Sequence, residues 1–433
     1  MNAGELQGLG LSMLSRFARS DLADRLHLRK PVEQLLYRGS KAGFQLAGAA
    51  ARAFKGDAQP RQRLPGASRP DLFDLSLSDE QQMMQESLQR FAADVLRPAA
   101  SNADHEARLP DGLRAQAQEL GLAYYAVPEA HGGVAAEAST MTQVLAAEAL
   151  AHGDFTLAAT LLAPIGVANA ITRWGSAEQQ ARYLPAFAGE HPPVAAIAVS
   201  EPRPLFDPYR LQTVATREGD GYRLNGVKSQ VIAGADAELL LVAASLVGQP
   251  VLFLVEGGSE GLAFKDAEGM GLKAAGLTDL QLTDVFVPAS ARLGDGDFDY
   301  TAFLDHGYLA WCALAIGTCQ AVMDYVVPYC NERTAFGEPI SHRQAVAFLI
   351  ADMAIEIDAM RMLTWRAAAL AEAGKPFHRE AYLARLLCAE KAMKIGTDGV
   401  QLLGGHGFTK EHPVERWYRD LRAVAIAHGG QHL

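Results

Sequence analysis

The chain has few cysteines, and none of its four belongs to a C-x-x-C pair. Cys312, Cys319, Cys330 and Cys388 stand in apolar stretches of helical periodicity. This predicts buried free thiols and no cysteine metal site or disulfide framework. We therefore expect no metal, and a reducing, cytoplasmic location. The chain also lacks a glycine-rich turn between a strand and a helix, so that a Rossmann-type nucleotide site is not expected.

Positive charge is scarce, and its distribution is uneven. The net charge of -11 argues against binding to nucleic acid. Residues 1–70 nevertheless carry 12 Lys or Arg against 5 Asp or Glu, a net of +7, which leaves -18 for the rest. No apolar run is long enough to predict a bilayer span. Residues 1–14 lack a charged segment before their apolar stretch, so no secretory signal is expected.

The basic leader is expected to be helical over residues 1–58, and a Pro- and Gly-containing linker follows at residues 59–70. Two interpretations of the leader stay open. In the first, the helix packs on the body or on a partner subunit. In the second, it is a peripheral anchor at the membrane surface. The first is favoured because Asp21, Asp24 and Glu33 dilute the basic face.

Three blocks of different periodicity follow the leader and linker. Residues 71–190 are expected to form an α-helical domain. Residues 191–299 contain short apolar or alternating runs separated by Gly, Asp and Pro, which is typical of a small antiparallel β domain. Residues 300–433 return to helical periodicity, as at Leu309, Cys312 and Ile316. The order helix, β, helix predicts a multi-domain α+β protein rather than a doubly wound sheet.

The most specific signals are two segments of the C-terminal block. They are Arg333-Thr-Ala-Phe336-Gly337, which runs on to Gln344, and Gln401-Leu-Leu-Gly404-Gly405-His-Gly407-Phe408. A guanidinium donates two parallel hydrogen bonds to a phosphate. Glycines allow a backbone to approach a ligand closely. An arginine and a glutamine at helix starts, with a Gly-Gly turn, therefore predict a site for a diphosphate and a planar ring.

With both segments in this order, residues 75–430 resemble the acyl-CoA dehydrogenase family of flavoproteins. Ser200-Glu201-Pro202 and Asn225-Gly226-Val-Lys228 in the β block agree with this. The resemblance implies an N-terminal α-helical domain, a middle β domain and a C-terminal four-helix bundle. It also implies FAD as cofactor and α,β-dehydrogenation of an acyl-CoA to the trans-2-enoyl-CoA. Electrons would pass to an electron-transfer flavoprotein, and a shared site would require a homodimer or homotetramer.

The resemblance also assigns roles to individual residues. Arg333 would pair with the FAD diphosphate, while Phe336 and Gln344 would lie at its adenosine half. The other matching positions are Gln401, Gly404 and Gly405 for the cofactor of the neighbouring subunit, Ser200, Ile232 and Gly430 for the flavin half, and Asp305 and Tyr308 for the CoA. Tyr308 stands where the family usually has an arginine, and Gln230 and Ile232 replace a tryptophan and a threonine.

The catalytic base departs from the family pattern. The usual glutamate position is His428, and the alternative glutamate position is Gly307. Neutral imidazole is a competent base near pH 7, so one hypothesis makes His428 the catalytic base. Its alternative interpretation is a solvated or capping histidine. A second hypothesis is a non-catalytic subunit that completes the FAD site of a Glu-bearing paralogue in a hetero-oligomer, and a third is an acyl-CoA-binding or dehydratase-like protein.

Overall fold

The computed structural model describes Arg38 and residues 75–135, 138–294 and 298–429. The chain divides into two units, Met1–Leu72 and Phe73–Leu433. In the first unit only Arg38, which is helical and exposed, is described. The expected leader helix and its membrane contact therefore lie outside the described residues. The helices and strands that are described below belong to the second unit.

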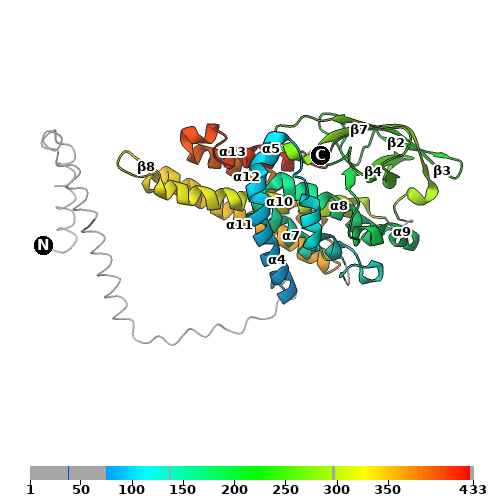
Figure 1. Ribbon diagram of the computed structural model, residues 1–433, viewed down its shortest axis with the longest axis horizontal. Helices are drawn as coiled ribbons and strands as arrows, with labels where there is room; N and C mark the ends of the chain where they lie inside the picture. The colour runs from blue at the N-terminus through cyan, green and yellow to red at the C-terminus, as the bar shows by residue number, and fades with distance from the viewer. Residues whose placement is uncertain (1–37, 39–74, 136–137, 295–297, 430–433) are drawn as a thin grey trace. The chain divides into compact units, whose positions relative to one another are not determined.

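Helices make up the first part of this unit (Figure 1). They are α4 (Asp79–Phe91), η1 (Ala92–Leu96), α5 (Arg97–Glu106), α6 (Leu113–Glu119), η2 (Leu122–Ala126), η3 (Glu129–His131), α7 (Thr140–Gly153), α8 (Phe155–Trp174) and α9 (Ala177–Phe187). Side-chain caps fix several starts: Ser78 and Gln81 form a capping box on α4, and Asp154 accepts from the Leu157 amide at the start of α8.

The middle part is a seven-stranded sheet. Its strands are β1 (Ala195–Ala198), β2 (Val214–Glu218), β3 (Gly221–Val231), β4 (Leu239–Leu246), β5 (Gln249–Glu256), β6 (Leu262–Asp266) and β7 (Thr278–Pro288). The strand order is β1-β4-β2-β3-β7-β6, and β5 pairs with β4. The short helical turns η4 (Lys273–Ala275) and η5 (Ala289–Ala291) flank β7.

The predicted β domain is present, but its sheet is mixed rather than wholly antiparallel. β4 runs parallel to both β1 and β2, while the other pairings are antiparallel. Long connections let β4 return beside β1 in the same direction, which sequence periodicity does not report. Apolar periodicity does not mark β2 and β6 in the sequence, because most of their residues are exposed or half-buried.

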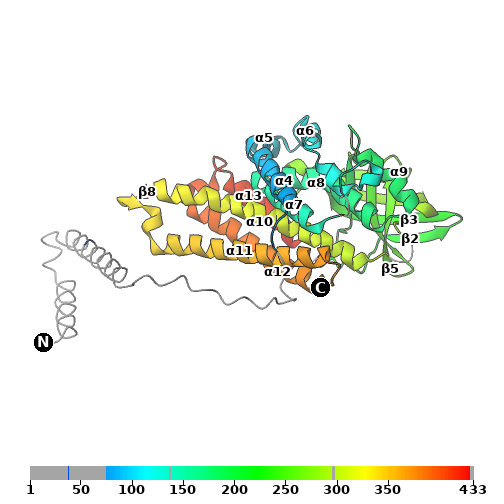
Figure 2. The same ribbon diagram turned by 90° about the horizontal axis from the view of Figure 1, so that it is seen from below.

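The last part is the expected four-helix bundle. It comprises α10 (Tyr300–Glu332), the hairpin β8 (Thr334–Ala335) and β9 (Glu338–Pro339), the turn η6 (Ile340–His342), α11 (Gln344–Glu372), α12 (His378–Leu402), the turn η7 (Gly404–Phe408), α13 (Val414–Leu421) and the turn η8 (Arg422–Ala425). The β8 hairpin stands at the end of the bundle away from the sheet in both views (Figures 1 and 2). α10, at 33 residues, runs about 50 Å from the sheet side to that end.

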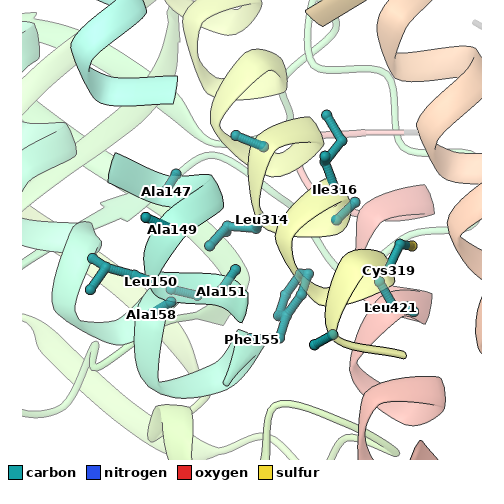
Figure 3. Packing of buried hydrophobic residues seen from close by; sticks show 14 of the residues in the cluster. Ala147, Ala149, Leu150, Ala151, Phe155, Ala158, Leu314, Ile316, Cys319 and Leu421 are labelled. Carbon is teal, nitrogen blue, oxygen red and sulfur yellow. The ribbon is translucent and has the colours of Figure 1, made fainter. Parts of the chain in front are cut away.

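The largest core joins the N-terminal helices to the bundle. Alanines of α7, among them Ala147 and Ala151, lie beside Leu314 of α10 (Figure 3). Contact is close because both helices use small residues: a Cβ on Gly317 would lie 2.1 Å from the Glu148 carbonyl oxygen. The four cysteines are buried and free, as expected.

Two helices, Phe155–Trp174 and Tyr300–Glu332, are long and apolar enough to cross a membrane by length and composition, contrary to the expectation from sequence. Within the most apolar 18-residue stretch of each helix, 67% and 61% of the stretch is buried inside the protein. Both helices therefore serve as core helices of this unit, which explains their composition.

Candidate functional site

A cavity of about 290 Å³ lies where the helices meet the sheet. α7 and α8 form one side, and the N-terminal half of α10 forms another. The segment after α13 and the edge of the β domain close the remainder. The wall is mostly apolar, with Leu162, Ile165, Trp311 and Leu314 among the residues that line it. An apolar cavity with a few polar groups is the usual form of a small-molecule site.

His428 lies in the wall of this cavity. Its Nδ1 atom is enclosed and has no hydrogen-bond partner, while its ring stands edge-on to Trp311 with the ring centroids 6.2 Å apart. The backbone there is left-handed, with a φ of 56°, which is strained for a residue other than glycine. His428 is thus a cavity residue rather than a solvated surface histidine.

Two residues of other helices hold this strained segment in place. The Tyr308 hydroxyl of α10 donates to the His428 carbonyl oxygen at 3.2 Å. Arg385 of α12 donates to the Ala427 carbonyl at 3.1 Å and to the Gly429 carbonyl, and its guanidinium stacks 3.9 Å from the centroid of the Tyr308 ring. No sequence motif marks Arg385, and its role follows from tertiary contact alone.

Burial lowers the pKa of His428 to about 4, and the positive charge of Arg385 adds to this effect. The imidazole is therefore neutral at pH 7, and one ring nitrogen has a free lone pair. A second cavity histidine, His306, is likewise neutral, because burial lowers its pKa to about 3 and Arg173 acts in the same direction.

The β-domain side of the cavity contains two of the predicted cofactor residues, Ser200 and Ile232. Ser229 and Gln230 lie beside them and also face the cavity. The Ser200 carbonyl accepts from the Ser229 amide at 2.9 Å, which ties the loop after β1 to β3. This wall offers two hydroxyls and an amide next to an aliphatic face, a combination that suits a planar ring with polar edges.

A buried ion pair supports that wall. Lys228 Nζ lies 2.9 Å from Glu201 Oε1, and the two side chains are 0% and 2% exposed. Lys228 also donates to the Val199 carbonyl, and Glu201 accepts from the Gln212 and Thr213 amides at 2.8 Å. Burial lowers the pKa of Lys228 to about 8, although Glu201 opposes the shift.

Asp305 and Tyr308, the predicted CoA-side residues, lie behind the cavity wall. Asp305 is buried and its carboxylate lies 2.9 Å from His378 Nδ1; burial raises its pKa to about 6. Burial raises the pKa of Tyr308 to about 12. In this structure Tyr308 positions the His428 segment, and contact of either residue with CoA stays a prediction.

The other predicted cofactor residues lie at the far end of the bundle and do not meet the cavity. We name them the tip cluster: Arg333, Phe336, Gln344, Gln401, Gly404 and Gly405. All six are exposed, and the Phe336 side chain is 94% accessible. The Tyr329 hydroxyl donates to the Leu403 carbonyl at 3.3 Å, so that both segments belong to the same end. Gly430 lies outside the described residues.

One group of potential metal ligands occurs in the described part of the chain, although none was expected. The ligand atoms of His406, Glu411 and His412 lie within 4.8 Å of one another. His412 Nδ1 also lies 2.7 Å from the Tyr325 hydroxyl. Glu411 is exposed, with 69% of its side chain accessible, so this group borders solvent beside the tip cluster.

Family models match nearly all of the second unit. The acyl-CoA dehydrogenase N-terminal, middle and C-terminal domains match residues 78–191, 196–285 and 296–432. The bovine mitochondrial short-chain specific acyl-CoA dehydrogenase is 32% identical over 365 residues, which are 82% of this chain and 88% of that protein.

Solved structures agree with these matches. Butyryl-CoA dehydrogenase from Megasphaera elsdenii superposes with a TM-score of 0.77 at 30% identity, over 83% of this chain and 96% of that one. A complex of PigA with FAD and proline superposes with a TM-score of 0.76 at 26% identity, over 83% and 96% of the two chains. The N-terminal, middle and C-terminal domain models all match, and we conclude that this chain belongs to the acyl-CoA dehydrogenase family.

Proposed function

We propose that this chain catalyses the FAD-dependent α,β-dehydrogenation of an acyl-CoA to the trans-2-enoyl-CoA, with His428 as the base that removes the α proton. The observation that carries the proposal is the His428 imidazole: it is neutral, and its enclosed Nδ1 has no partner in the wall of an apolar cavity. Family resemblance supports an electron-transfer flavoprotein as the acceptor of the electrons.

FAD is the cofactor of this reaction, and the residues present fit its flavin half. Ser200, Ser229, Gln230 and Ile232 form one wall of the cavity that also contains His428. When bound, FAD would supply the acceptor for the hydride of the β carbon. This wall would hold the polar edge of the ring with its hydroxyls and amide, while Ile232 would cover part of the face.

The chain's own residues carry the proton chemistry. The free nitrogen of His428 takes the α proton of the thioester, and the apolar residues around it exclude water. Tyr308 and Arg385 bind the backbone of the His428 segment, so that the ring does not turn away from the cavity. A pKa of about 4 makes His428 a weaker base than free imidazole, so the substrate proton must itself be acidified in the complex.

We further propose a homodimer or homotetramer in which two chains share each FAD. From Tyr308 to Arg333, α10 extends about 37 Å, so that the cavity and the tip cluster of one chain lie far apart. One dinucleotide therefore uses the cavity of one chain and the tip cluster of another. α11 presents an exposed apolar row at intervals of seven residues, Phe348, Ile355 and Met362, which suits a helix–helix contact between chains.

The test is the flavin content of the purified protein followed by reduction with acyl-CoA thioesters. One FAD per chain, bleached by substrate in the wild type but about 100-fold more slowly in His428→Asn, supports the proposal. Equal bleaching rates for the two proteins would exclude His428 as base. His105→Asn, a change of an exposed histidine on α5 outside the cavity wall, is the matched control.

The non-catalytic subunit is the second candidate, and the cavity gives it one argument. Among the described residues that line the cavity there is no Asp or Glu to act as a carboxylate base. If the chain completes the site of a Glu-bearing paralogue, the purified homomer should stay colourless with added FAD. Co-expression with the paralogue should then give one FAD for each pair of chains, and Arg333→Met should lower that occupancy.

A further inference from the structure

A polar patch lies on the α7/α8 side of the cavity. Arg173 Nε, Asn169 Oδ1, Gln143 Nε2 and His306 Nδ1 are enclosed side-chain atoms without a hydrogen-bond partner. All four residues line the cavity. Buried polar atoms are almost always paired in native proteins, so that such a cluster marks the place of a ligand group.

Local contacts bring these four residues together around Arg173. Asn169 and Arg173 are four residues apart on α8 and so share one face of the helix. The Arg173 Nη2 donates to the Ala138 carbonyl at 2.6 Å and to Thr140 Oγ1 at 3.0 Å, which places the guanidinium one turn before Gln143 on α7. The next residue, Trp174, packs edge-on against the His306 ring at 5.9 Å between centroids.

The charges of the cavity favour an anion at this patch. The charged residues among the described lining are arginines, namely Arg173, Arg419 and Arg422. Arg419 is already paired with Asp104 and Glu415. The carboxylate that interacts with Arg173 is that of Glu372, which binds the Thr140 amide outside the cavity and forms no direct ion pair with Arg173 in the described part of the chain. His306 is neutral. Arg173 therefore brings positive charge to the patch, and its Nε–H is an enclosed donor without a partner there, beside the amides of Gln143 and Asn169.

We propose that the patch binds a carboxylate at the distal end of the acyl chain, so that the preferred substrate class is ω-carboxyacyl-CoA thioesters. This inference rests on the proposed function and deepens it. Arg173 Nε and Gln143 Nε2 donate to the carboxylate, and the Asn169 amide turns its nitrogen toward it. An unsubstituted chain leaves these donors buried without partners, and a site of that kind selects strongly against it.

The test compares thioesters of matched length. The purified protein, as isolated with its flavin, is titrated with adipyl-CoA, hexanoyl-CoA and free CoA by calorimetry and by the fluorescence of the cavity tryptophans Trp174 and Trp311. We expect adipyl-CoA to bind at least about tenfold more tightly than hexanoyl-CoA. Arg173→Met and Gln143→Leu should each remove most of this preference and leave hexanoyl-CoA within about twofold.

Gln143→Leu protects the test from misfolding, because it deletes a donor that makes no hydrogen bond in the folded chain. Arg182→Met, a change of an exposed arginine on α9, is the matched control. Equal affinity for the two thioesters overturns the proposal. So does an equal loss of adipyl-CoA, hexanoyl-CoA and free CoA binding in Arg173→Met, which would place the arginine on the CoA moiety. Because binding is read without turnover, a catalytically silent protein that keeps the preference refutes the proposed function alone.

Discussion

The imidazole of His428 occupies the space that a side chain at Gly307 would need. A Cβ on Gly307 would lie 2.7 Å from His428 Nδ1 and 2.9 Å from its Cε1. These are the two positions at which relatives are expected to place the catalytic glutamate. The chain carries a glycine at one and an imidazole at the other, and the two choices depend on each other sterically.

Gly307→Ala should therefore be harmful only while His428 is present. In the wild type the added methyl group forces the ring out of the cavity wall, and displacement of a base by about 1 Å costs up to about 100-fold in rate. In His428→Ala the same change should stabilise α10 by about 1 kcal/mol, as alanine does in a helix interior. Urea unfolding of the four proteins gives the coupling free energy, expected at about 1–3 kcal/mol.

A coupling near zero would show that the ring moves aside at no cost. Gly374→Ala is unsuitable as a control because the backbone there is left-handed. Gly258→Ala is suitable, since its added Cβ meets nothing within 4 Å, and it should leave unfolding nearly unchanged.

The sequence predicted the three-part architecture because each part has its own periodicity. It did not predict which helix face would enclose the cavity, since α7 and α8 are apolar almost all round. Ser200, Ile232 and His428 were predicted from motifs, and the structure places all three in the cavity wall. Arg173 and Arg385 stand in ordinary helical stretches, and their roles depend on residues that are distant in sequence.

The stability of the protein should depend on pH through His428. Its folded pKa of about 4 lies below the unfolded value near 6.5, so that the unfolded chain binds more protons between these values. The contribution of His428 to the free energy of unfolding is thus complete above pH 6.5 and is lost as the pH is lowered toward 4. Wild type should lose about 3 kcal/mol more than His428→Asn over this range, measured by urea unfolding at fixed protein concentration.

The rate of dehydrogenation should also depend on the ionisation of His428. If His428 is the base, kcat/KM should rise with pH through an apparent pKa near 4 and stay level around neutral pH. A rise centred near pH 6.5 would mean that the imidazole is solvated in the working enzyme, which contradicts its position in the cavity wall. The pH profile of His105→Asn, a change of an exposed histidine outside the cavity wall, serves as reference.

Removal of one partner of the Lys228–Glu201 pair should lower the free energy of unfolding more than removal of both charges together. Lys228→Met leaves a buried carboxylate, and Glu201→Gln leaves a buried ammonium group, each at a cost of about 3–5 kcal/mol. The double variant removes both charges, so that its loss should be smaller than the sum. Additive losses in thermal or urea unfolding would show that the two groups do not interact.

The exposed row on α11 should decide both assembly and FAD retention. Ile355 is 65% exposed in the single chain, and Ile355→Glu would place a charge in the middle of the proposed interface. We expect this variant to elute as a monomer in light-scattering chromatography and to lose its FAD, because the tip cluster can then no longer reach another chain's cavity. Met83→Glu, a change of an equally exposed apolar residue on α4, should retain both properties. A monomeric Ile355→Glu protein with full flavin would refute the shared site, since one chain would then hold the whole cofactor.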